Sequence, residues 1–212
     1  MSASATSLRA IMVCGAAASG KTSVGHGLSR AIGWPLLDLD EVAPPAATLV
    51  GEASGLLVHR ERMDASPTRS AADRRRYDAL LAEARRTLAQ GGEVKAATLP
   101  PFLRTGIVLV APFTLERMLP HAFEAAIASL GIVRAEAALV WVDTPASVTA
   151  QRMRWRAADR DAARIRAERA GGPLTSTPPA QEGIPLTPHL RSDGLLPVTR
   201  QVALLIQALQ DR

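Results

Sequence analysis

The chain has 212 residues, 47% of them hydrophobic, which suits one globular domain with a core of ordinary size. No apolar run reaches the about 18 residues of a membrane span, and the first ten residues lack the features of a signal peptide, so we expect a cytoplasmic protein with no membrane partner. The net charge of +5 attracts phosphate, but aromatic residues make up only 3% and no base-stacking motif occurs, so nucleic acid is not the expected partner.

Apolar runs alternate with helical patterns along the whole chain. This alternation predicts an α/β fold with a parallel sheet of five strands. The expected strands are 9–14, 35–39, 107–111, 137–142 and 188–191, and the expected helices lie near 20–32, 70–90, 114–130, 145–169 and 198–210. Cys14, the only cysteine, ends the first strand, where we expect a small buried residue rather than a reactive thiol.

The first expected strand runs into "GAAASGKT", residues 15–22, which fits the phosphate-binding pattern G-x-x-x-x-G-K-[ST]. A chance match is improbable because the chain has only two lysines. The alternative is that these residues form a plain flexible turn without a nucleotide. The glycines allow the turn, Lys21 reaches the β- and γ-phosphates, and Thr22 places a hydroxyl on Mg²⁺. The expected nucleotide-binding residues are Gly15, Ala16, Ala17, Ala18, Ser19, Gly20, Lys21, Thr22 and Ser23.

The second expected strand ends in "LLDLDE", residues 36–41, which carries two carboxylates one residue apart. In a parallel α/β sheet, ligands bind at the carboxyl ends of the strands. We therefore expect Asp38, with Thr22, to hold the water shell of Mg²⁺, and Asp40 to act as the base on the attacked hydroxyl. The alternative is that an aspartate caps the next helix or is only solvated.

Three features follow along the chain. Phe113, after the third strand, either lines an acceptor pocket or packs in the core. Asp143 ends the fourth strand, and we expect it to cap the next helix. Residues 171–187, "GGPLTSTPPAQEGIPLT", are too rich in Gly, Pro and Thr for a packed helix, and form either a lid or a plain surface loop.

The P-loop, the D-x-D and an arginine-rich stretch together resemble small-molecule P-loop kinases such as shikimate and gluconate kinases, within the nucleoside-monophosphate-kinase-like group. The resemblance covers nearly the whole chain. It implies a P-loop NTPase three-layer sandwich with a helical lid. A set of predicted kinases known only as AAA family ATPases, a label that names no substrate, is similar in "RYDALLAEA" (76–84), "VLVAPFTLER" (108–117), "LVWVDTP" (139–145) and "RMRWRAADRDAAR" (152–164).

The resemblance also implies roles for three arginines. Arg152 takes the place of the residue that packs on adenine, and Arg156 and Arg160 take the place of the lid arginines that stabilise the transition state. A solvated basic helix face is the alternative, because the chain has 23 arginines. On this interpretation, residues 1–212 form a single kinase domain with a lid over about 152–187.

One segment departs from the pattern of the resembling kinases. These run from "GGEV" directly into "VLVAPF", whereas here "KAATLPPFLRTGI", residues 95–107, lies between. Its two prolines exclude a central strand. It is therefore either a surface insertion or a segment that displaces the third strand.

These features predict an ATP- and Mg²⁺-dependent kinase that phosphorylates a hydroxyl of a small metabolite, such as a sugar or a sugar acid. Its expected catalytic residues are Lys21, Asp40, Arg156 and Arg160. A polynucleotide or nucleoside kinase and an ATPase without a small-molecule acceptor remain the alternatives. A GTPase is disfavoured because no N-K-x-D motif occurs. The acceptor and the oligomeric state do not follow from the sequence.

Overall fold

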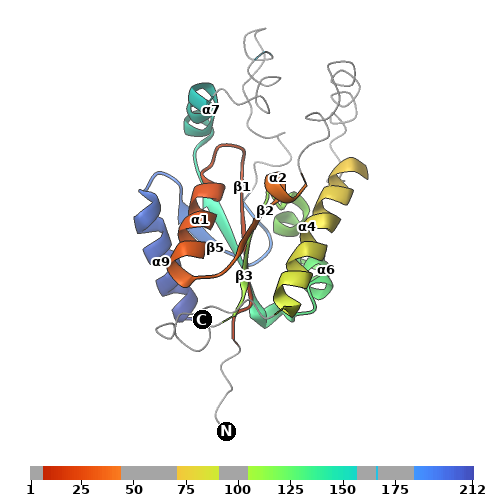
Figure 1. Cartoon of the computed structure of the whole chain (residues 1–212). Coiled ribbons are helices and arrows are strands. Elements are labelled where there is room, and N and C mark those ends of the chain that lie inside the picture. Colours follow the sequence, from red (N-terminus) through yellow and green to blue (C-terminus); the bar gives the residue numbers. More distant parts are fainter. Residues whose placement is uncertain (1–6, 44–70, 91–104, 157–165, 167–183) are drawn as a thin grey trace.

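The computed structural model describes residues 7–43, 71–90, 105–156, 166 and 184–212. Within these residues, five parallel strands form one sheet in the order β2-β3-β1-β4-β5. The strands are β1 Ala10–Gly15, β2 Leu36–Asp38, β3 Ile107–Val110, β4 Ala137–Asp143 and β5 Leu190–Asp193. The predicted parallel sheet is thus confirmed, and β1 lies at its centre (Figure 1).

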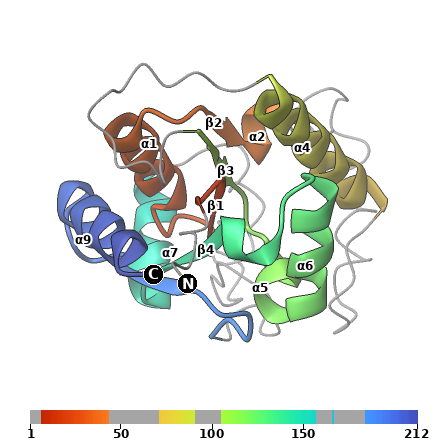
Figure 2. The same cartoon turned by 90° about the horizontal axis from the view of Figure 1, so that it is seen from below.

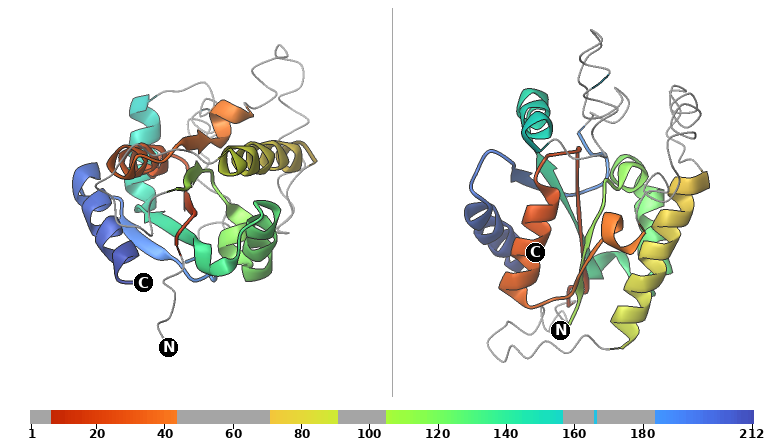
Figure 3. Two further views of the ribbon diagram at one scale, coloured as in Figure 1. Left: turned by 60° about the horizontal axis from the view of Figure 1, so that its bottom comes forward. Right: turned by 45° about the horizontal axis from the view of Figure 1, so that its top comes forward.

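Helices cover both faces of this sheet, as expected for a three-layer α/β sandwich. Helices α1 and α9 lie on one face, and α4 and α6 lie on the other (Figures 2 and 3). Within the described part of the chain, no helix is both long and apolar enough to cross a membrane. The helices are α1 Lys21–Ile32, α2 Leu39–Val42, α4 Ala71–Ala89, α5 Thr114–Met118, α6 Pro120–Ser129, α7 Ala146–Arg156 and α9 Val198–Gln210, with a 3₁₀ turn at Arg134–Glu136.

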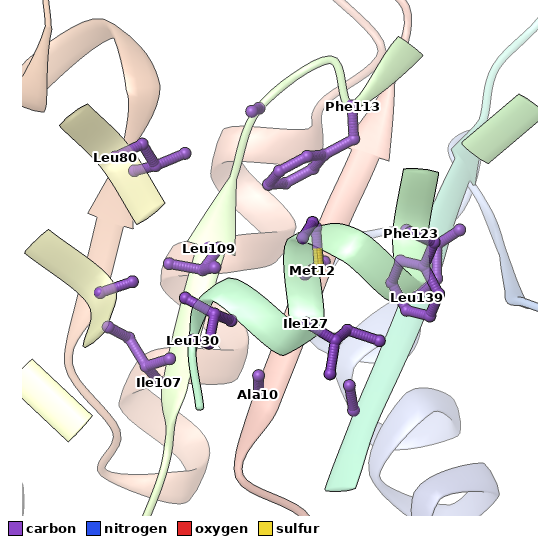
Figure 4. Packing of buried hydrophobic residues seen from close by; sticks show 14 of the residues in the cluster. Ala10, Met12, Leu80, Ile107, Leu109, Phe113, Phe123, Ile127, Leu130 and Leu139 are labelled. Carbon is purple, nitrogen blue, oxygen red and sulfur yellow. The ribbon is translucent and has the colours of Figure 1, made fainter. Parts of the chain in front are cut away.

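The side chains of each central strand alternate between two hydrophobic cores. In β1, Met12 belongs to the core under α4 and α6, and Val13 to the core under α1 and α9. Figure 4 shows Phe123 and Ile127 of α6 packed near Met12 on the first of these faces. Because both faces are covered, the central strands read as continuous apolar runs, which made them visible in the sequence.

Helix α1, which contains the last residues of the phosphate-binding pattern, packs closely against its neighbours at two glycines. A Cβ atom added at Gly25 would lie 2.3 Å from Cγ2 of Val110 on β3. One added at Gly27 would lie 2.7 Å from Cγ2 of Val202 on α9. The helix therefore packs closer to the sheet and to α9 than alanine at these positions would allow.

Two expectations about the elements need correction. The predicted helix 114–130 is two helices, α5 and α6, because Leu119 between them is extended, with φ −125°, and precedes Pro120. The short helix α2, which carries Asp40, was not predicted.

Other expectations fall largely outside the described residues. The structure describes α7 to Arg156, and most of the expected helix to 169 and of the lid at 152–187 lies beyond that part. Residues 91–104, most of the extra segment, also lie outside it. The strand that follows this segment, β3, pairs with both β1 and β2.

Candidate active site

The phosphate-binding pattern connects the carboxyl end of β1 to the N-terminus of α1. Gly20 adopts φ 99° and Ala18 adopts φ 59°, so two residues of the loop use the left-handed region. Gly15 makes the loop tight, because an added Cβ would lie 2.6 Å from Oγ of Ser19 and 2.9 Å from the carbonyl oxygen of Val142. The local sequence of small residues is what permits this backbone path.

The N-terminus of α1 suits an anion. No side chain caps this end, and no acidic residue lies in the first turn. The first helical bond runs from the N–H of Val24 to the carbonyl of Gly20, so the preceding N–H groups have no acceptor within the helix. Lys21 lies in the same turn, and its Nζ donates to the carbonyl of Ala16 in the loop at 3.2 Å. Loop, helix end and lysine together fit a phosphate group.

Arg152 of α7 connects the loop to the turn after β5. Its Nη1 donates to the carbonyl of Ser19 at 3.0 Å, and its Nη2 donates to the carbonyl of Gly194 at 2.8 Å. Thr144 also donates to the carbonyl of Ser19, at 2.9 Å. The Oγ atom of Ser19 is itself buried and has no hydrogen-bond partner. Arg152 therefore lies beside the loop, while its expected contact with adenine stays a prediction.

Asp38 lies at the end of β2 and contacts both the loop helix and α2. Its Oδ2 accepts a hydrogen bond from the hydroxyl of Thr22 at 3.0 Å, and its Oδ1 accepts one from the backbone N–H of Asp40 at 2.9 Å. Asp38 itself is buried, and both of its contacts are partly buried. The structure thus brings together the two residues expected at the metal, and Asp38 caps α2 at the same time.

Asp40 lies on α2 and forms an ion pair with Arg76 of α4. Nη2 of Arg76 lies 2.9 Å from Oδ1 of Asp40, and Nε of Arg76 donates to the carbonyl of Ala43 at 2.6 Å. Nothing in the sequence indicated a role for Arg76. No local signal could have found the pair, because 36 residues separate its members.

The remaining expected arginines are only partly described. Arg156 is the exposed last residue of α7, and Arg160 lies outside the described residues. Their roles over the phosphates stay predictions.

Phe113 and Asp143, which follow or end a strand, both have partners within the protein. Phe113 is fully buried in the core under α4 and α6, and packs edge-on against Tyr77 with ring centroids 5.8 Å apart. The expectation that Asp143 caps α7 is wrong. That helix begins at Ala146, and Oδ2 of Asp143 accepts hydrogen bonds from Nε and Nη2 of Arg191 instead.

Two ionisable groups that influence each other, Cys14 and Arg117, are buried. Burial raises the pKa of the Cys14 thiol to about 12, against a smaller lowering by the charges of Arg117 and Lys21. Burial likewise lowers the pKa of Arg117 below its ordinary value. Cys14 is therefore protonated and shielded, as expected for a core residue rather than a nucleophile. Arg117 was not singled out by the sequence.

Comparison with known proteins identifies the family and the fold. Residues 11–171 match a family model described as an AAA domain, and no curated protein matches the chain. A putative kinase from Chloroflexus aurantiacus is similar in structure, with a TM-score of 0.57 and 17% identity over 97% of this chain and 98% of that one.

Two further solved structures share the fold. A sugar kinase from Janibacter sp. gives a TM-score of 0.53 at 16% identity, covering 96% of this chain and 95% of that one. The APS kinase of Mycobacterium tuberculosis, in complex with AMPPNP and APS, gives a TM-score of 0.52 at 20% identity, covering 97% of this chain and 99% of that one. The chain therefore has the fold of P-loop kinases, and at these identities the likeness shows no more than the fold.

Proposed function

We propose a function for this chain from the premise that it belongs to the AAA domain family: it is an ATP- and Mg²⁺-dependent kinase that transfers the γ-phosphoryl group to a hydroxyl of a small metabolite. The observation that carries the proposal is the 3.0 Å hydrogen bond between Thr22 and Asp38, beside Lys21 and the uncapped end of α1. The helix end expected to bind phosphate and the two residues expected at Mg²⁺ are therefore neighbours, which supports the proposal.

The ligand set at this point suits Mg²⁺. Among the described residues, no three or more His, Cys, Asp or Glu side chains gather where they could hold a metal. A cation beside Thr22 and Asp38 would therefore have one protein hydroxyl and one carboxylate, with water and phosphate oxygens completing its shell. Mg²⁺ is commonly bound with few protein ligands, whereas Ca²⁺ takes more of them.

Each residue around the loop would have its own role in phosphoryl transfer. Lys21 and the first-turn N–H groups of α1 would bind the β- and γ-phosphates. Mg²⁺, bound with the nucleotide, supplies charge neutralisation on the phosphate oxygens. Arg156 and Arg160 would stabilise the charge that develops as the phosphoryl group moves, and Arg152 would pack on the adenine.

Asp40 is the proposed base. Its carboxylate would accept the proton of the acceptor hydroxyl as the bond to phosphorus forms. Nη2 of Arg76 donates to one oxygen of the Asp40 carboxylate, and this hydrogen bond orients the Asp40 side chain on α2. Because Asp38 caps α2 and also contacts Thr22, the same residue sets the position of the base relative to the phosphate-binding helix.

A screen of ATP consumption tests the proposal. Purified protein with Mg²⁺ would be assayed against sugars, sugar acids, amino-alcohols, nucleosides and oligonucleotides. We expect consumption to require one small acceptor and Mg²⁺. Consumption that depends on oligonucleotides alone, or that is the same with no acceptor, would contradict the small-molecule proposal and favour a polynucleotide kinase or a simple ATPase.

A further inference from the structure

Gln201 of α9 is a polar residue at a position where the helix otherwise buries apolar side chains. The other buried residues of this helix, Val202, Leu205 and Leu209, all belong to the core under α1 and α9. Gln201 is 5% exposed. Taking an amide out of water is costly unless its polar atoms find partners, so a buried glutamine at this position calls for an explanation.

Both polar atoms of the Gln201 amide are used, and they connect α9 to the two ends of the turn after β5. Oε1 accepts a hydrogen bond from the hydroxyl of Ser192, within β5, at 2.6 Å. Nε2 donates to the carbonyl of Leu196 at 2.7 Å. A carbonyl can only accept, so the amide nitrogen faces Leu196 and the amide oxygen faces Ser192. The amide therefore spans the turn and fixes the distance between its ends.

The turn itself, residues 193–196, is closed by its own hydrogen bonds. The N–H of Leu195 donates to Oδ1 of Asp193 at 2.9 Å, and the N–H of Leu196 donates to the carbonyl of Asp193 at 3.1 Å. The N–H of Gly194 donates to the carbonyl of Asp143, at the end of β4, at 2.7 Å. A displacement at one end of such a turn is carried to the other end.

The middle of this turn contacts the phosphate-binding loop. Arg152 donates to the carbonyl of Gly194 and to the carbonyl of Ser19 in the loop. A Cβ atom added at Gly194 would overlap Oγ1 of Thr144, and that hydroxyl also donates to the carbonyl of Ser19. Two polar side chains therefore lie between the turn and one carbonyl of the loop.

Helix α9 also packs directly on α1, the helix in which the phosphate-binding pattern ends (Figure 1). A Cβ atom added at Gly27 of α1 would lie 2.7 Å from Cγ2 of Val202 and 3.2 Å from Cγ1 of Val198. Val202 directly follows Gln201. One helix thus contacts α1 through apolar side chains and the turn through an amide, and the loop lies between these two contacts.

We propose that Gln201 is a positioning residue for the nucleotide site. Its amide sets the place of the turn at 193–196, and the turn sets the place of the Ser19 carbonyl through Arg152. This inference rests on the proposed function, in which the loop binds the phosphates of ATP. Gln201 acts through the turn, without touching the nucleotide. An apolar residue of similar size at this position would fill the core but release the turn.

Gln201→Met should weaken nucleotide binding in a folded protein, because methionine fills a similar volume but cannot donate to Leu196. Binding of a non-hydrolysable ATP analogue with Mg²⁺, measured by calorimetry, should be about tenfold weaker. In the kinase assay, the ATP concentration for half-maximal rate should rise while the maximal rate changes little. Amide exchange in the free protein should be faster in residues 15–22 and 193–196. The exposed Gln207→Met, on the same helix, is the matched control and should change none of these.

A second variant of α9 shows what a purely structural role looks like. Leu205→Ala removes buried apolar volume from the same helix, so it should lower the free energy of unfolding in urea and leave the affinity of the folded protein for the analogue unchanged. If Gln201→Met gave this result, with lower stability and wild-type affinity, the proposal would be overturned.

A double-mutant cycle tests whether Gln201 and Arg152 act through the same turn. Arg152→Ala, Gln201→Met and the double variant would each be titrated with the analogue. The loss of affinity in the double variant should be clearly smaller than the product of the two single losses, since either change alone already releases the turn from the loop. Losses that simply multiply would show that the two residues act separately, against the proposal.

The failure of this inference differs from the failure of the proposed function. If Gln201→Met does not fold, Ser192→Ala, which leaves Oε1 without its donor, takes its place. It should bind the analogue more weakly and exchange faster in both segments, and wild-type behaviour would overturn the proposal. A wild-type protein that bound no ATP analogue would contradict the kinase instead. The exchange comparison, made without nucleotide, would then still decide whether Gln201 positions the loop.

Discussion

Asp38 links the phosphate-binding helix to the proposed base. One carboxylate oxygen accepts from the hydroxyl of Thr22 and the other from the N–H of Asp40. The sequence predicted that Thr22 and Asp38 would both lie at the metal, because ligands bind at the carboxyl ends of parallel strands, but it did not predict the hydrogen bond between them. The second contact also fits the alternative considered there, an aspartate that caps the next helix.

The two carboxylates of the D-x-D should respond differently to Mg²⁺. Asp38→Asn should raise the Mg²⁺ concentration needed for half-maximal rate, because a charged group beside the metal is lost. Asp40→Asn should lower the maximal rate with little change in nucleotide affinity, because an amide cannot accept the proton. Mg²⁺ titrations of both variants decide this. If both variants gave the same Mg²⁺ titration curve as the wild type, Asp38 and Asp40 would have only a structural role.

Lys21 should be needed for transfer but not for folding. Lys21→Ala should lower the rate of phosphoryl transfer on the order of 100-fold or more, because a charge that stabilises the transition state is removed. A coupled assay measures the rate, and circular dichroism checks the fold. Arg30→Ala, at the exposed end of the same helix, is the matched control and should keep its activity. Near-normal turnover in the lysine variant would show that the loop does not bind the transferred phosphate.

Helix α7 and the turn after β5 are both connected to the phosphate-binding loop through Arg152. Arg152 bridges the carbonyls of Ser19 and Gly194, residues that are far apart in the chain. The sequence predicted that Arg152 belongs to the nucleotide site through its resemblance to known kinases. It gave no indication of the bridge, since hydrogen bonds to backbone carbonyls leave no pattern of residue types.

Removal of the Arg152 bridge should loosen the loop. Arg152→Ala should speed amide hydrogen exchange in residues 15–22 and weaken binding of an ATP analogue about tenfold, as expected for the loss of charged hydrogen bonds. Gln151→Ala, an exposed neighbour on the same helix, should change neither. Unchanged exchange in the loop, measured by mass spectrometry, would show that the bridge does not support it.

The close packing of α1 on β3 predicts an unusual response to alanine. In an exposed helix, alanine is more favourable than glycine by about 1 kcal/mol. At Gly25 the added Cβ would lie 2.3 Å from the stiff, buried side chain of Val110, so Gly25→Ala should lower the free energy of unfolding by about 1–3 kcal/mol. Urea denaturation measures this, with the exposed His26→Ala as control. A more stable Gly25→Ala protein would mean that the helix can shift away from the sheet.

Across the whole molecule, the order of strands brings the ends of β1, β2 and β3 together at one edge of the sheet. The sequence predicted the strands because buried parallel strands are continuous apolar runs. It missed the break at Leu119, where Pro120 interrupts an otherwise apolar helical pattern. It also missed the Asp40–Arg76 pair and the burial of Arg117, because both depend on how α4 and α5 pack and not on local spacing.

The fate of the γ-phosphoryl group tests the central claim most directly. Protein with Mg²⁺ and ATP labelled at the γ-phosphate would be incubated with the panel of small hydroxy compounds, and the products separated by chromatography. The account predicts that label appears on one small acceptor and that Lys21→Ala abolishes this transfer. Label found only in inorganic phosphate, at the same rate with every acceptor and with none, would contradict it.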